Sequence, residues 1–124
     1  MAISQERSKR KSTGGRYKRT VKKSKNRGNL PTLTKLAPKK LKPIRTRGGF
    51  KKIRLLGINI VNAYNPKIKK HEKLKIETVV DSKANKNYIR RNIITKGSIV
   101  KTSQGNVKIT SRPGQEPILD GVLV

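Results

Sequence analysis

Two glycine pairs lie next to arginines, and residues of these types at this spacing could bind phosphate groups. One pair lies in Thr13-Gly14-Gly15-Arg16, and the other, Gly48-Gly49, follows Arg45 and Arg47. Glycine lets the backbone approach a phosphate or sugar closely, and the guanidinium fork matches phosphate oxygens. Neither pair is a nucleotide-binding fingerprint, because no strand precedes the first and no Lys-Ser/Thr ending follows either. The pattern favours phosphate contacts along a polyanion over its alternative, a flexible linker.

Catalytic chemistry finds no support in the sequence. The single histidine, His71, lies in a polar run and is typical of a solvated turn residue without partner ligands. The six acids are spaced neither as a converging carboxylate pair nor as a metal-binding loop. No nucleophile elbow is present, and the absence of cysteine excludes disulfides and thiolate metal sites. We therefore expect no enzyme activity, no metal, no cofactor and no small-molecule substrate.

Positive charge is concentrated in the first 52 residues. That segment holds nineteen of the 33 Lys and Arg residues but a single acid, Glu6, and so carries +18 of the formal net charge of +27. Like charges at this density repel one another, and few apolar residues are present to offset chain entropy. We expect the segment to become ordered only when a large polyanion, such as nucleic acid, neutralises it.

The chain divides into three segments, and the elements predicted within them must position these cations. Residues 1–29 are a basic arm, and residues 30–50 form a connector that Pro31, Pro38 and Pro43 make extended and irregular. Residues 53–124 are rich in short strand patterns. The predicted fold is mainly β, a small C-terminal barrel of about five to six short strands after a long irregular arm, with domains at 1–52 and 53–124.

Turn signals divide the barrel segment. We expect a bulge or bend near residues 55–57, a turn at Asn65-Pro66, a helical turn over 88–91 and a turn at Pro113-Gly114. Gly105 predicts a hairpin between strands 99–102 and 107–110, and residues 118–124 predict the last strand. In 72–81, alternation predicts that Leu74, Ile76, Thr78 and Val80 share one face.

Candidate RNA-binding residues are the cations and glycines of the arm and connector, with some loop cations of the barrel segment. They are Arg7, Lys9, Arg10, Lys11, Thr13, Gly14, Gly15, Arg16, Tyr17, Lys18, Arg19, Arg27, Arg45, Arg47, Gly48, Gly49, Lys51, Lys52, Arg54, Arg90, Arg91, Lys96 and Arg112. For Arg91 and Arg112, a structural ion pair with Asp81 or Glu116 is an equal alternative.

The aromatic residues divide between binding and packing. Tyr17 lies in the arm, where stacking on a base or ribose is plausible. Phe50 and Tyr64 are expected at the core or its edge. The exposed lysines Lys67, Lys69, Lys70 and Lys83 are expected to be an ordinary solvated surface. No apolar run approaches the roughly 18 residues of a membrane span, so no membrane partner is expected.

Three motifs in order resemble a known family. They are Lys11-Ser12-Thr13-Gly14-Gly15-Arg16, the run from Asn87 to Gly97, and Thr110-Ser111-Arg112-Pro113-Gly114-Gln115 before an apolar C-terminal strand. The chain resembles the archaeal and eukaryotic small-subunit ribosomal protein eight, the "e-type" family, in its shorter archaeal form. It departs from the family where Gly48-Gly49-Phe50 replaces the usual Gly-Gly-Asn and where Gly28-Asn29-Leu30-Pro31 replaces Gly-Arg-x-Pro.

The resemblance implies a small barrel and an arm threaded through small-subunit ribosomal RNA. We expect a structural constituent of the small ribosomal subunit, cytoplasmic, with ribosomal RNA and neighbouring ribosomal proteins as partners. The alternative is a free RNA chaperone or DNA-compacting basic protein. A membrane-active cationic peptide precursor is a weaker third possibility.

Overall fold

The computed structural model describes residues 8–18 and 28–124. The chain divides into two compact units, Met1–Pro31 and Thr32–Val124. In the first unit, residues 8–18 form a tight hairpin-like loop in which Arg10 and Arg16 make an antiparallel bridge. The Lys11 amide donates to the Gly15 carbonyl at 2.7 Å, and Gly14 takes a φ of +80°, which glycine adopts without strain.

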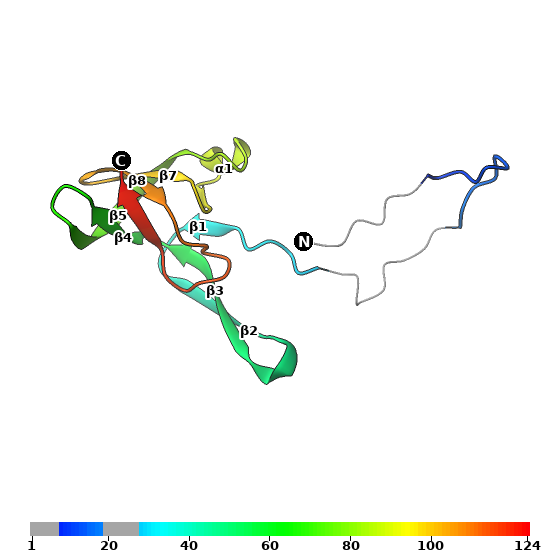
Figure 1. Cartoon of the computed structure of the whole chain (residues 1–124), viewed down its shortest axis with the longest axis horizontal. Coiled ribbons are helices and arrows are strands. Elements are labelled where there is room, and N and C mark those ends of the chain that lie inside the picture. The colour runs from blue at the N-terminus through cyan, green and yellow to red at the C-terminus, as the bar shows by residue number, and fades with distance from the viewer. Residues whose placement is uncertain (1–7, 19–27) are drawn as a thin grey trace. The chain divides into compact units, whose positions relative to one another are not determined.

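A closed five-stranded barrel forms most of the second unit (Figure 1). Its strands are β4 (Ile60–Asn65), β5 (Lys70–Asp81), β7 (Ile99–Thr102), β8 (Gly105–Ile109) and β9 (Asp120–Leu123). Neighbouring strands pair antiparallel, except that β9 runs parallel to β4 and closes the barrel. Closure leaves these five strands without an unpaired edge.

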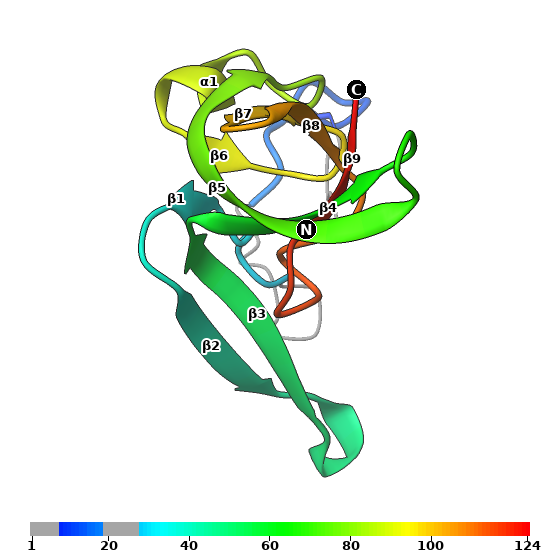
Figure 2. The same cartoon turned by 90° about the vertical axis from the view of Figure 1, so that its left-hand side faces the viewer.

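A second, four-stranded sheet extends from the barrel in the order β2-β3-β1-β6. Its strands are β1 (Thr34–Leu36), β2 (Lys40–Arg45), β3 (Lys51–Ile58) and β6 (Ile93–Ile94). The helical turn α1 (Asn87–Arg90) precedes β6, and a short 3-10 turn, η2 (Arg47–Gly49), joins β2 to β3. Figure 2 shows the β2–β3 hairpin projecting away from the barrel.

One apolar core connects the barrel with the base of the second sheet. Leu55 of β3 and Ile94 of β6 are fully buried with barrel residues, among them Val61, Val100 and Val107. The buried Thr34 hydroxyl donates to the Leu55 carbonyl at 2.6 Å, which satisfies a polar group that would otherwise be costly to bury. The inner end of the hairpin is therefore anchored in the core, whereas its outer end is not.

Most predicted turns are confirmed. β4 ends at Asn65, whose side chain accepts from the Lys67 amide, and Gly105 begins β8 with a φ of +132°. The irregularity expected near residues 55–57 is also present, because Lys40 pairs with Gly57 while Leu41 pairs with Leu55. Leu56 is thus an extra residue on β3, and the barrel fold itself is confirmed.

Two local expectations are wrong. The connector is not irregular, since β1 and β2 lie within it and both pair with β3. Pro43 is tolerated because β2 is the edge strand of its sheet. In β5 the pairing with β7 shifts between Ile76 and Thr78, so Val79 is buried and Val80 is exposed. A bulge offsets the two-residue period by one, and the pattern after it faces the opposite way.

The compact second unit starts at Thr32, within the expected connector. The predicted division assigns RNA binding to the arm and connector, 1–52, and a folded domain to the barrel, 53–124. This division of roles stays a prediction.

Among the described glycines, Gly121 is the one with the closest neighbours. A Cβ built there would lie 2.5 Å from Val107 Cγ1 and 2.9 Å from the Lys108 carbonyl oxygen. Gly121→Ala should therefore lower the free energy of unfolding by about 1–3 kcal/mol, the usual cost of overpacking. Urea unfolding followed by circular dichroism measures this loss.

Gly114→Ala is the matched control, because its nearest neighbour, Thr32 Cβ, would lie 3.5 Å from the new carbon, an ordinary contact. Its stability should stay within about 0.5 kcal/mol of the wild-type value. Equal stability of the two variants would contradict the packing argument.

Candidate nucleic-acid interface

The loop at residues 8–18 gathers several predicted site residues on one exposed element. Its antiparallel bridge brings Arg10 and Arg16 opposite each other, and the Arg10 guanidinium donates to the Gly14 carbonyl at 3.2 Å. The Lys11 ammonium lies 5.7 Å from the centre of the Tyr17 ring. The predicted residues of this loop are all exposed: Lys9, Arg10, Lys11, Thr13, Gly14, Gly15, Arg16, Tyr17 and Lys18. Arg7, Arg19 and Arg27 lie outside the described residues.

The β2–β3 hairpin gathers a second group. Arg45 pairs with Lys51 across the strands, whereas Lys52 and Arg54 lie on the opposite face of β3 from Lys51. Cations therefore project from both faces of the hairpin. The sequence has no acid between Glu6 and Glu72, so the hairpin itself carries no carboxylate, and the ion pair present among the described residues does not involve it.

The hairpin tip has a well-defined backbone. The amide and the hydroxyl of Thr46 both donate to the Phe50 carbonyl, at 2.7 and 2.9 Å, and the Gly49 amide donates to the Thr46 carbonyl. Gly48 and Gly49 have φ values of +81° and +84°, a conformation that favours glycine at both positions. The glycine pair is thus required by the turn, in addition to any close approach of a ligand.

Arg54 lies at the base of the hairpin and is half-buried. Its guanidinium donates to the Thr32 hydroxyl at 3.4 Å, and its buried Nε has no hydrogen-bond partner among the described residues. Burial of a donor without an acceptor is costly, and here no acid compensates for it. Arg54 therefore adds uncompensated positive charge where the hairpin meets the barrel.

The predicted residues of the barrel segment lie at separate places. Arg90 ends α1 and Arg91 follows it, Lys96 precedes the turn at Gly97, and Arg112 begins the turn at Pro113-Gly114. All four side chains are exposed. Both views place α1 and the hairpin tip at opposite ends of the second unit, so its candidate residues do not form one patch (Figures 1 and 2).

The alternative role for Arg91 and Arg112, a structural ion pair, is not observed. Within residues 8–18 and 28–124, the ion pair present joins Lys101 to Glu77 at 3.7 Å, and both side chains are more than half exposed. Glu116 does accept a hydrogen bond at residue 112, but from the backbone amide. The guanidinium groups of Arg91 and Arg112 thus remain available to an external anion.

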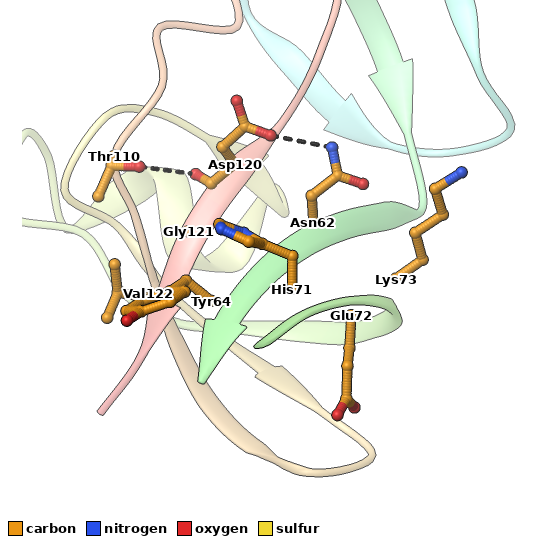
Figure 3. A pocket seen from close by; sticks show the side chains of 9 residues that line it. All are labelled: Asn62, Tyr64, His71, Glu72, Lys73, Thr110, Asp120, Gly121 and Val122. Carbon is orange, nitrogen blue, oxygen red and sulfur yellow. Dashed lines mark hydrogen bonds between the residues drawn. The ribbon is translucent and has the colours of Figure 1, made fainter. Parts of the chain in front are cut away.

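An open pocket on the barrel surface is lined by polar side chains, among them Asn62, His71 and Asp120 (Figure 3). Asn62 Nδ2 donates to Asp120 Oδ1 at 2.9 Å, and the rings of Tyr64 and His71 lie 4.9 Å apart and tilted by 42°. Glu72 points away from Asp120 in this view and accepts from Gln104, so the two carboxylates do not converge. The described residues also contain no cluster of three or more potential metal ligands. The pocket offers neither a nucleophile–base pair nor an acid–base pair.

Sequence reasoning missed two features of the hairpin. Phe50, expected at the core or its edge, is 75% exposed at the hairpin tip. The signal was the glycine pair before it, which forms a turn and turns residue 50 away from the core. Lys40 and Lys42 also belong to the hairpin and were not among the predicted residues.

No helix in the described part of the chain has the length and apolar character needed to cross a membrane.

Comparisons with known proteins agree with the motifs. A family model described as ribosomal protein S8e matches residues 4–124. The chain is 48% identical to the small ribosomal subunit protein eS8 of Methanococcus aeolicus, covering 100% of this chain and 98% of that protein. It is 46% identical to the eS8 protein of Methanobrevibacter smithii over the full length of both, and 48% identical to that of Nanoarchaeum equitans over 90% of this chain and 89% of that protein.

The family model spans the arm and the barrel, and the relatives named above are archaeal proteins that match over most or all of their length. The chain therefore belongs to the ribosomal protein S8e family, in its archaeal form, and is a structural protein and not an enzyme.

Proposed function

We propose that this protein is a structural constituent of the small ribosomal subunit that binds ribosomal RNA through its basic arm and the β2–β3 hairpin. The observation that carries the proposal is the acid-free stretch between Glu6 and Glu72, whose described cations are largely exposed and without carboxylate partners. Its relatives are named small ribosomal subunit proteins, and a member of this family works on the ribosome, in the cytoplasm.

Phosphate neutralisation supplies the binding energy in this proposal. Each Lys or Arg that contacts a phosphate releases condensed counterions, and this gain grows with the number of contacts. Arg10 and Arg16 in the loop at 8–18, and Arg45 and Arg47 in the hairpin, would each present a guanidinium fork to phosphate oxygens. The glycines beside them leave the backbone accessible to ribose and phosphate.

The barrel acts as the head that holds these elements. Under the proposed division, residues 1–52 supply most RNA contacts and residues 53–124 supply a folded body, with Arg54 at the boundary. The end of the barrel unit that carries Arg90 and Arg91 would contact a different RNA segment from the hairpin, because the two lie at opposite ends (Figure 2). The protein would then bridge RNA segments and reduce phosphate repulsion between them.

A fourfold alanine variant of the hairpin tests the phosphate contacts. Replacing Arg45, Arg47, Lys51 and Lys52 should weaken binding to small-subunit ribosomal RNA. The slope of log K against log salt should flatten by up to about 3.6, because each lost contact removes roughly 0.7–0.9 from it. Binding is measured by fluorescence anisotropy across a salt series.

The matched control for that variant replaces Lys67, Lys70, Lys75 and Lys83, four exposed lysines of the barrel segment, with alanine. It removes the same charge and should change the slope much less. Equal flattening in both variants would mean that total charge, and not the hairpin, determines binding.

Co-sedimentation tests the assignment to the small subunit. The tagged full-length protein, expressed in an archaeal host, should migrate with the small subunit on a sucrose gradient and remain there after a moderate-salt wash. The fourfold hairpin variant should be released at lower salt than the wild type. Spread of the wild-type protein over free RNA or DNA fractions would instead support a free chaperone or DNA-compacting protein.

A further inference from the structure

The hairpin tip presents an aromatic ring that the barrel does not use. Phe50 is 75% exposed, far from the core, and a single exposed apolar residue would need no explanation by itself. Phe50, however, has two further features. The backbone at residue 50 is held in a defined turn, and the neighbouring residues in the sequence are all neutral or cationic.

The turn holds the ring in a restricted position. Two hydrogen bonds from Thr46 fix the Phe50 carbonyl, and a Cβ added at Gly48 would lie 3.4 Å from both Cδ2 and Cε2 of the ring. One part of the ring therefore packs against Gly48, and the high exposure leaves the rest of its surface to solvent. The backbone that carries the ring therefore has little conformational freedom left to lose when a ligand covers that surface.

The charge around the ring limits what can cover it. Arg47 and Lys51 flank the tip, and Arg45 and Lys52 follow on the two strands. The flanking cations favour an anionic partner, and the exposed ring favours one with a flat apolar face. An unpaired nucleotide has both features, since its base stacks on aromatic rings while its phosphates meet the adjacent cations.

We propose that Phe50 is a stacking site for an unpaired RNA base, with Arg47 and Lys51 contacting the phosphates on either side of that nucleotide. This inference rests on the proposed RNA-binding function and adds to it the kind of RNA structure recognised. A paired helix hides the faces of its bases within the stack, so the tip should prefer a loop, bulge or strand end. The projecting hairpin can enter such a structure without obstruction by the barrel (Figure 2).

A tryptophan reporter tests this contact directly, because the chain contains no tryptophan. The full-length Phe50→Trp variant is mixed with a stem–loop RNA and with a fully paired RNA of the same length. Stacking should quench the indole emission with the stem–loop and leave it nearly unchanged with the paired RNA. Anisotropy of the labelled RNAs reports binding in the same samples.

Affinity measurements separate stacking from charge. Phe50→Ala should weaken binding to the stem–loop by roughly five- to a hundredfold, the range of one lost base–aromatic stack. The salt slope should stay unchanged, since no phosphate contact is removed. Phe50→Leu, which keeps an apolar side chain of similar size, should lose most of the same affinity, and thermal unfolding should be unaltered in all three variants.

The results distinguish this inference from the function on which it rests. Unchanged emission and unchanged affinity in the Phe50 variants, with RNA binding intact, would overturn the stacking site alone and would favour contact of the ring with a neighbouring protein. Full affinity in Phe50→Leu would likewise exclude stacking. Failure of the wild-type protein to bind either RNA would overturn the proposed function.

Discussion

Charge repulsion that the chain cannot relieve by itself is the constraint on which the rest of the structure depends. A net charge of +27 on 124 residues includes a stretch of 65 positions, from 7 to 71, without one acid. The Lys101–Glu77 contact in the described part of the chain is solvent-exposed, and such pairs contribute little. The protein must therefore keep its cations out of its core, and under the proposed function an external polyanion completes the neutralisation.

The fold meets this constraint by separating apolar from basic residues in space. The barrel and the inner end of the hairpin share one core, to which Leu55 and Thr34 connect the second sheet. Exposed cations lie on the outer surface of the barrel and on elements that leave this core: the outer hairpin, the end that carries α1, and, in the other unit, the loop at 8–18. A closed barrel suits a small domain of this kind because it buries a continuous core with few residues and leaves no strand edge among its five strands.

Local signals predicted local structure well, and pairing across the chain was predicted poorly. Asn65-Pro66 and Gly105 act through their own backbone preferences, and both turns occur where expected. Val80 was assigned to the wrong face because β5 contains a bulge. The bulge depends on pairing with β7, and the hydrophobic periodicity of β5 alone carries no information about that pairing. β2 was missed because Pro43 argues against a strand until its edge position is known. Among the candidate binding residues, Arg45, Arg47, Lys51 and Lys52 were predicted from charge and lie together on the hairpin, and their contact with RNA stays a prediction. Phe50 was misplaced because a lone aromatic is usually buried.

The hairpin brings a defined backbone to RNA, and under the proposed function this order gives it a role of its own. The hairpin tip is held by Thr46, Gly48 and Gly49 and is anchored through β3 to the core, so binding there loses little conformational entropy. A preorganised element of this kind can distinguish one RNA shape from another, because a mismatch in shape removes contacts that cannot rearrange. The basic arm supplies charge in greater amount, and each of its residues that becomes ordered on RNA costs roughly 1–2 kcal/mol. Under the proposed function, the arm therefore contributes mainly salt-dependent affinity, and the hairpin contributes the selection of an unpaired site.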